Sequence, residues 1–280
     1  MAAAVAHPPI IINGRDFTPH ARNPGSAFDR VVSFAKSSYG SFRVLQLLER
    51  VARAAVYVLK AMGNVATTTI EYVEKRAGDL GKAWQLLIVT RCIEVTKSAK
   101  KAIVEWVHPD PHNLPVDANR DKVQKVHEIA EAAAAYGYFG SWFAGSTPLR
   151  NVADTANLVS DVTDLQLAAQ DWYLAKKHLE IVDKDYAGQP AAHNQFAYTM
   201  RHAFIRIVKA VTSVTTGVLG LMALALGTAF VSPVFLLGCG IVATTAAMWA
   251  HFYKESRTLD MVDLFANRAP PVVLAAAVAG

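Results

Sequence analysis

The feature that most constrains this chain is a stretch of 41 residues, Ala210 to Ala250, without a single Asp, Glu, Lys, Arg or His. It contains Val231-Ser232-Pro233 near its middle, and a proline normally ends a helix at the residue before it. Each half approaches the roughly 20 residues that a helix needs to cross a bilayer. The sequence therefore predicts a transmembrane helical hairpin over 210–253, with Ser232 and Pro233 in its turn.

The alternative is a hairpin buried inside a soluble helical bundle. A core helix of a soluble protein usually keeps a polar edge, which this stretch lacks, so a membrane is favoured. Composition agrees, since 52% of the 280 residues are hydrophobic and only 18% are charged, against about 25% charged in a typical soluble chain. Small residues recur on one face of each half and predict close helix packing: Gly220, Ala223 and Gly227 in the first, Gly240, Ala243 and Ala247 in the second.

Basic residues flank both ends of the predicted hairpin. Arg201, Arg206 and Lys209 precede it, and Lys254 and Arg257 follow it. Positive charges beside a membrane helix are retained on the cytosolic side. The flanks therefore predict an integral membrane protein with both termini in the cytosol.

The rest of the chain has helical periodicity, and no segment predicts a strand. The expected fold class is all-α, a helical N-terminal domain followed by a C-terminal two-helix transmembrane hairpin. The predicted segments are a flexible N-terminal arm (1–25), a cytosol-facing α-helical domain (26–187), a hinge with a basic juxtamembrane helix (188–209), the hairpin (210–253) and a C-terminal tail (254–280).

Two segments of the N-terminal part are rich in apolar residues. Ala132–Leu149 has 18 residues without charge; its glycines and Pro148 favour a place in the core over an interfacial loop or a third span. Ser41–Met62 predicts a helix that ends at Gly63-Asn64. Its apolar positions recur at three- and four-residue steps, the pattern of a stripe that faces a core: Val44, Leu48, Val51, Ala55, Val58 and Met62.

Charges on two predicted helices share the spacing 7, 3, 7. The basic stripe is Arg43, Arg50, Arg53 and Lys60, and the acidic stripe is Asp154, Asp161, Asp164 and Asp171. The two stripes could pair within the domain or between protomers, or they could be two solvated faces, which is the usual case. The basic stripe could instead contact anionic lipid headgroups.

The sequence contains no recognised catalytic or cofactor motif. Walker, G-x-G-x-x-G, H-E-x-x-H, C-x-x-C and G-x-S-x-G patterns are missing. Cys92 and Cys239 are the only cysteines, and we expect both to be reduced. The net charge of +5 is spread among acids, and no nucleic-acid module is present. We therefore expect no enzyme activity, no cofactor, no metal and no nucleic acid. The expected partners are membrane lipid, proteins that bind residues 26–187 and, as an alternative, a second copy of the chain.

The uncharged double segment Ala210–Ala250 resembles the bilobed hydrophobic domain of chlamydial inclusion-membrane (Inc) proteins. The resemblance implies secretion by a type III machine, insertion into the inclusion (vacuole) membrane of an infected host cell, and a domain that faces host cytosol. That family shares no catalytic motif, so the resemblance assigns no residue a role.

A second resemblance is to the peroxisomal membrane-elongation peroxins. Ser38–Arg50 (SYGSFRVLQLLER) is similar to the amphipathic helix with which that family remodels lipid, and Asn157–Leu165 (NLVSDVTDL) is similar to a later helix. The resemblance implies membrane remodelling. The uncharged double segment of this chain is longer than that family needs.

Overall fold

We describe residues 9–109, 117–226, 231–262 and 264–265 of a computed structural model. The fold is all-α, as predicted. The one addition among the described residues is a β-hairpin near the N-terminus, with two residues in each strand, which the sequence did not predict. The elements are β1 (Ile11–Ile12), β2 (Arg15–Asp16), α1 (Ala27–Lys36), α2 (Ser38–Met62), α3 (Thr67–Leu86), α4 (Ile88–Val107), α5 (Ala118–Ala144), α6 (Thr147–Asp185), α7 (Pro190–Leu226) and α8 (Pro233–Glu255).

Local sequence signals set several of these helix ends. Gly63 ends α2 in the left-handed conformation, at φ 68°, which a glycine adopts without the clash of a β-carbon. Ser232 caps α8, where its side-chain oxygen accepts a hydrogen bond from the Phe235 N–H at 3.4 Å. Pro233 is the first residue of α8, a position that needs no N–H donor. The predicted break before α8 is thus confirmed.

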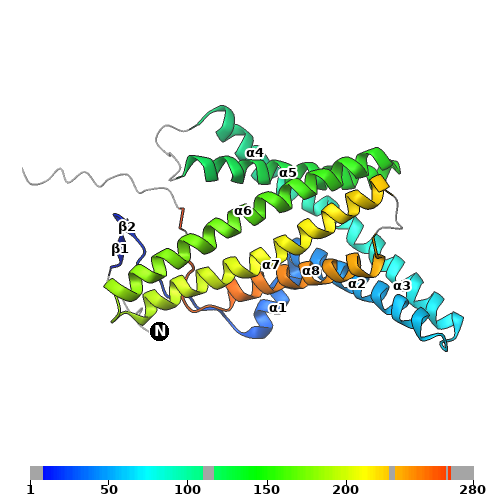
Figure 1. Cartoon of the computed structure of the whole chain (residues 1–280), viewed down its shortest axis with the longest axis horizontal. Coiled ribbons are helices and arrows are strands. Elements are labelled where there is room, and N and C mark those ends of the chain that lie inside the picture. The colour runs from blue at the N-terminus through cyan, green and yellow to red at the C-terminus, as the bar shows by residue number, and fades with distance from the viewer. Residues whose placement is uncertain (1–8, 110–116, 227–230, 263, 266–280) are drawn as a thin grey trace, which may run out of the picture.

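Six helices form three antiparallel pairs, and in each pair the first helix ends and the second begins at the same end of the molecule (Figure 1). These pairs are α2–α3, α5–α6 and α7–α8, and we call this end the tip end. The long helix α6 packs between α5 and α7, while α8 packs against α7 and α2. The α6–α7 turn and the β1–β2 hairpin lie at the opposite end, which we call the base.

The uncharged segment 132–149 is the tip of the α5–α6 pair. The two helices touch at Gly137, where an added β-carbon would lie 2.8 Å from the Ala153 β-carbon. Ala132 and Ala135 are buried, as the predicted core position requires, but Phe143 is 82% exposed. The core prediction is therefore confirmed for the start of the segment and wrong for its end.

Residues 9–25 are not the flexible arm that we predicted. Ile10, Ile12 and Phe17 are buried in a cluster with Val182 and Phe196, which belong to α6 and α7. Alternation along a strand of only two residues is too short a pattern to detect in the sequence. This segment closes the base of the bundle.

The C-terminal tail joins the same structure as far as it is described. Arg22 forms an ion pair with Glu255 at the end of α8, and its N–H donates to the Thr258 carbonyl at 2.7 Å. Val262 and Leu264 are buried in the cluster at the base.

The predicted hairpin is not separate from the domain before it. Helix α7 runs without a break from Pro190, through the predicted juxtamembrane segment, to Leu226. It packs along α6, and α8 packs on α2. Only the turn before Pro190 corresponds to the predicted hinge.

Removing a buried ring at the base tests this packing. Phe17→Ala should lower the free energy of unfolding by about 3–5 kcal/mol, because it deletes a buried aromatic side chain and leaves a cavity. Phe28→Ala is the matched control, since Phe28 on α1 is 74% exposed. Thermal unfolding of the purified protein should show a lower midpoint for Phe17→Ala only; equal midpoints would contradict the packing of this segment.

Candidate functional site

A buried network of ion pairs joins α5, α6 and α7. Asp164, which is 5% exposed, accepts from Arg206 at 2.7 Å and from Lys209 at 2.7 Å. Arg206 also bridges to Asp171 at 2.7 Å, and Arg120 of α5 reaches the other Asp171 oxygen at 2.7 Å. One cluster thus holds two carboxylates and three cations, one positive charge in excess.

The two buried acids of this region differ in pKa. Burial alone would raise the pKa of Asp164, but Lys209 and Arg206 outweigh burial and hold the pKa well below its ordinary value. Burial raises the pKa of Asp161 to about 6, with Lys209 acting against the rise and Asp164 adding to it. Asp161 accepts a hydrogen bond from the Asn157 amide at 2.9 Å. Asp164 therefore favours its charged form, whereas Asp161 is destabilised when charged.

The acidic stripe is therefore neither a solvated face nor the partner of the basic stripe. Its members point into the bundle, where Asp154 accepts from the Tyr138 hydroxyl at 2.6 Å and the other three lie as just described. Within the described residues no ion pair joins the two stripes. Of the basic stripe, Arg43 acts on Asp161 through its charge, which lowers the pKa of that acid.

The basic stripe makes its own contacts between α2, α3 and α8. Arg50 donates to the Gly240 carbonyl and to the Thr244 hydroxyl of α8. Arg53 pairs with Glu49 one turn earlier, and Lys60 pairs with Glu74 of α3. Arg50 thus lies against α8, whereas the Arg53 and Lys60 side chains are more than half exposed.

The apolar stripe of α2 points the opposite way, which makes the predicted core stripe wrong. Leu48, Val51, Val58 and Met62 are all exposed, with Val58 at 59%. The side of α2 that is buried carries Glu49 and Val56. Periodicity identified the stripe correctly but could not say what surrounds it.

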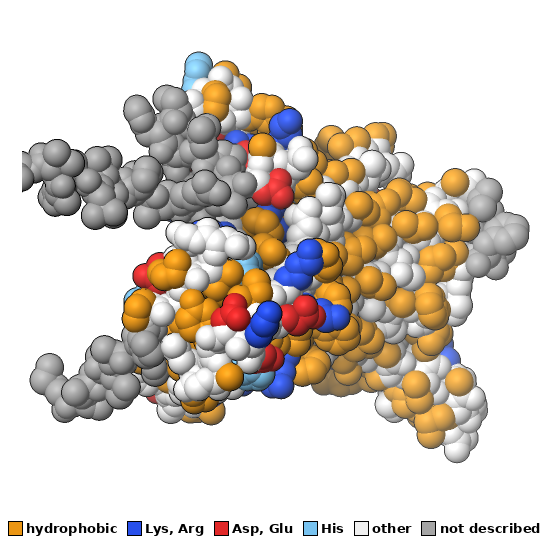
Figure 2. Space-filling view, turned by 60° about the vertical axis from the view of Figure 1, so that its left-hand side comes forward, with side chains coloured by type: hydrophobic (Ala, Val, Ile, Leu, Met, Phe, Trp, Pro, Cys, Tyr) orange, Lys and Arg blue, Asp and Glu red, His pale blue; other side chains and the backbone are white. Residues whose placement is uncertain are grey.

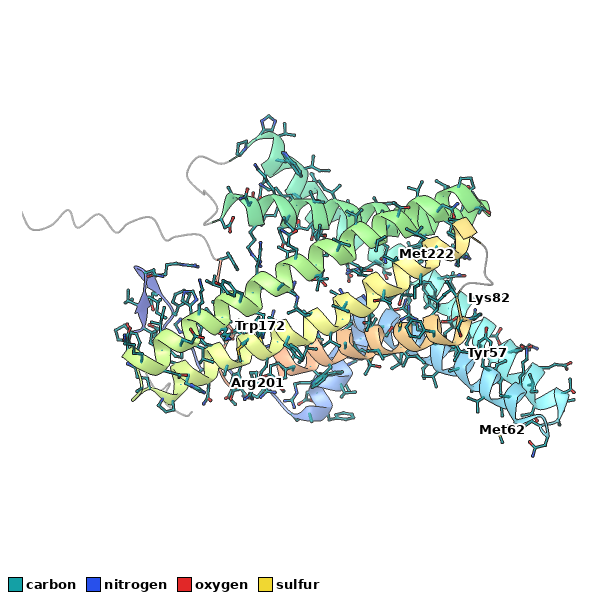
Figure 3. The ribbon with its side chains drawn as sticks, in the orientation of Figure 1. Tyr57, Met62, Lys82, Trp172, Arg201 and Met222 are labelled. Carbon is teal, nitrogen blue, oxygen red and sulfur yellow. The ribbon has the colours of Figure 1, made fainter. Side chains whose placement is uncertain are left out.

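Of the predicted juxtamembrane basic residues, Arg206 and Lys209 belong to the buried network. Arg201 and Lys254 are exposed, and Arg201 lies on the base half of α7 (Figure 3). Arg257 lies over the Tyr253 ring, with 3.9 Å from Cζ to the ring centroid. The network holds two of the five charges that we assigned to the membrane flank.

The small residues of the hairpin do not all pack as predicted. A β-carbon on Gly220 would meet no described atom within 4 Å, so the predicted close contact there is wrong. Gly227 lies outside the described residues. On α8, Ala243 and Ala247 are buried, while a β-carbon on Gly240 would lie 3.1 Å from the Arg50 guanidinium. Gly240 therefore makes room for an arginine of α2.

On the face seen in Figure 2, hydrophobic side chains cover the tip half and charged side chains gather toward the middle and base. The α2–α3 pair also carries exposed charges, among them Glu71, Lys75 and Arg76 of α3. Two helices, Pro190–Ala225 and Pro233–Glu255, are long and apolar enough to cross a membrane. Only 6% of the most apolar stretch of the first is buried, and 28% of that of the second. Exposed members include Val218, Met222, Leu224, Val234, Phe235 and Val242.

Sequence reasoning missed two residues of the site. Arg120 has no sequence signal that links it to Asp171, which lies 51 positions away. The burial of Glu49 has one weak signal, the basic residue Arg53 one turn later on the same helix.

Comparisons with known proteins identify no relative of this chain. No family model, no curated protein and no solved structure matches the chain. Among the described residues, no group of three or more His, Cys, Asp or Glu side chains could hold a metal ion.

We expect Asp164 and Asp161 to have opposite effects on the pH dependence of stability. The lowered pKa of Asp164 contributes stability above pH 4 that is lost as the pH falls. Asp164→Asn should destabilise the protein at pH 7 by about 3–5 kcal/mol, because buried cations lose their partner.

The shifted pKa of Asp161 affects the stability of the protein in the opposite direction. Its raised pKa costs stability above about pH 6 and nothing well below pH 4. Asp161→Asn should therefore stabilise by up to about 3 kcal/mol at pH 8, and the gain should shrink from pH 6 toward pH 4. Thermal unfolding midpoints of both variants, measured from pH 4 to pH 8, test the two predictions. An effect of Asp161→Asn that does not change with pH would contradict the raised pKa of Asp161.

Proposed function

We propose that this chain is a non-enzymatic integral membrane protein that inserts its uncharged α7–α8 hairpin into a bilayer. The observation that carries the proposal is the orientation of α2, whose apolar residues Leu48, Val51 and Val58 are exposed while Glu49 is buried and Arg50 reaches α8. A soluble protein gains stability from the reverse arrangement. In a bilayer, charged side chains turn toward the bundle interior and pair with one another or with backbone carbonyls.

The exposed hairpin supports the same conclusion. Val218 of α7 and Val242 of α8 are 41% and 45% exposed, and each lies near the middle of its half of the uncharged stretch. No charged residue lies on this stretch to favour contact with water. A bilayer would cover these side chains. The alternative, a soluble bundle, leaves them in water.

The geometry of the three pairs supports one topology. Each pair enters and leaves the tip end from the same direction, so its two ends remain on one side of the membrane. Insertion of the α5–α6 tip as well would therefore leave both termini in the cytosol, as the basic flanks predict. The network around Arg206 would then lie at the cytosolic boundary of the apolar region.

The base half would present the interaction surface. It includes the part of the helical region 26–187 that would stay outside the bilayer, where we expect partner proteins or a second copy of the chain to bind. The resemblance to Inc proteins would place this surface in host cytosol, on the membrane of an inclusion.

Membrane extraction tests the proposal. The chain, with a tag at each end, is expressed in cells; membranes are washed in alkaline carbonate, and separate intact membranes are treated with protease without detergent. We expect retention in the membrane and digestion of both tags. Release by carbonate would show that the hairpin is part of a soluble bundle, and protection of one tag would refute the topology.

A charge at the centre of the hairpin should prevent insertion. Val218→Lys combined with Val242→Lys should make the protein carbonate-extractable, because each lysine at mid-depth costs about 2.5–3.5 kcal/mol. Tyr173→Lys is the control, since Tyr173 on α6 is 54% exposed outside the uncharged segments. Equal retention of all variants would contradict insertion by this hairpin.

Membrane remodelling is a second candidate function, which the exposed apolar stripe of α2 favours. In the peroxins that the chain resembles, the corresponding helix shapes lipid. A peptide of residues 38–62 should then bind and tubulate anionic vesicles, as seen by electron microscopy. The same peptide with Leu48, Val51 and Val58 changed to Ser should not; vesicles that stay round with both peptides would remove this function.

A further inference from the structure

A cavity of about 580 Å³ lies between α2, α3 and the tip half of α7–α8. Its size is within the range of small-molecule sites. One wall is apolar, built by Val56, Leu236 and Leu237, and Pro233 closes one side. Tyr57, which also lines it, lies on the tip half of α2 (Figure 3).

The lining of the cavity has one more basic than acidic side chain. Its lining holds Arg50, Arg53 and Lys60 against Glu49 and Glu74. Arg53 and Lys60 are paired with the two glutamates, which leaves the charge of Arg50. The acceptors of Arg50, the Gly240 carbonyl and the Thr244 hydroxyl, are neutral, and no carboxylate of the described residues forms an ion pair with it.

A guanidinium in this position has donors left for a ligand. Arg50 uses Nη1 for both contacts with α8, and a guanidinium carries five N–H groups in a planar fork. That fork matches the oxygens of a carboxylate or a phosphate. A positive charge beside an apolar wall is stabilised most by an anion that brings its own apolar part.

We propose that this cavity binds one anionic amphiphile, with its phosphate or carboxylate on Arg50 and its hydrocarbon chain along Leu236 and Leu237. The shared chemistry is a negatively charged head joined to an acyl chain, and its source is either a phospholipid of the bilayer or a free fatty acid. The site needs the cavity and Arg50 rather than insertion of the hairpin, so it stands apart from the membrane proposal.

Two variants test separately the charge of Arg50 and the volume of the cavity. Arg50→Gln removes the charge and keeps one donor group. Gly78→Leu fills the cavity and keeps Arg50, because Gly78 lines the cavity on α3 and a β-carbon there meets no described atom within 4 Å. Arg201→Gln is the control, since Arg201 is an exposed arginine that does not line the cavity.

The measurement is native mass spectrometry of the full chain, purified in a non-ionic detergent and incubated with dioleoylphosphatidylglycerol, dioleoylphosphatidylcholine or palmitate. We expect one anionic molecule per chain, retained at least tenfold more than phosphatidylcholine. Arg50→Gln and Gly78→Leu should each reduce this retention at least tenfold, and Arg201→Gln should leave it unchanged. Retention of phosphatidylglycerol alone identifies a phospholipid ligand, and retention of palmitate alone identifies a fatty acid.

Other outcomes overturn the assignment. Equal retention of phosphatidylcholine would remove the role of the charge, and full binding by Gly78→Leu would place the ligand outside the cavity. If Arg50→Gln does not fold, Gly78→Leu decides the matter alone. Carbonate extraction measures membrane insertion independently. A protein that inserts but retains no anionic ligand would therefore refute the proposed ligand site and leave the membrane proposal intact.

Discussion

The bridge from Arg206 to Asp164 and Asp171 is the contact on which the arrangement of the long helices depends. It joins α7 to two positions of α6 that lie about two turns apart. Arg120 adds a contact from α5, and Lys209 adds a second contact from α7. A buried charge that loses its partner is strongly destabilising, so the register of the three helices is set at this level. Beyond it, α7 and α8 continue without charge toward the tip end.

The same electrostatic constraint explains the orientation of α2. Leu48 and Val51 on one side and Glu49 and Arg50 on the other cannot all be buried, and the structure turns the charged side inward. Arg50 reaches α8 because Gly240 has no side chain. An apolar medium around the tip end removes the cost of exposing the leucine and valine side chains, whereas water does not.

Much of the fold could be predicted because its signals are local. Gly63 ends a helix through its own backbone, and Pro233 begins one because it lacks an N–H. The direction of the α2 stripe was predicted wrongly, since periodicity shows which residues share a face but not what that face meets. The packing of Ile10 and Phe17 was missed because it depends on α6 and α7, more than 150 positions later.

The helical character of the chain and its 41 consecutive uncharged residues can be recognised from neighbouring residues alone, because helix ends and hydrophobicity are local properties. The pairing of acids with bases depends on how the helices pack. Asp164 pairs with Arg206 across 42 positions, and Asp154 accepts a hydrogen bond from Tyr138 instead of pairing with the basic stripe. Equal spacing along two helices makes such pairing conceivable. Pairing itself requires the helices to be adjacent at the same level, and that follows from how the whole bundle packs.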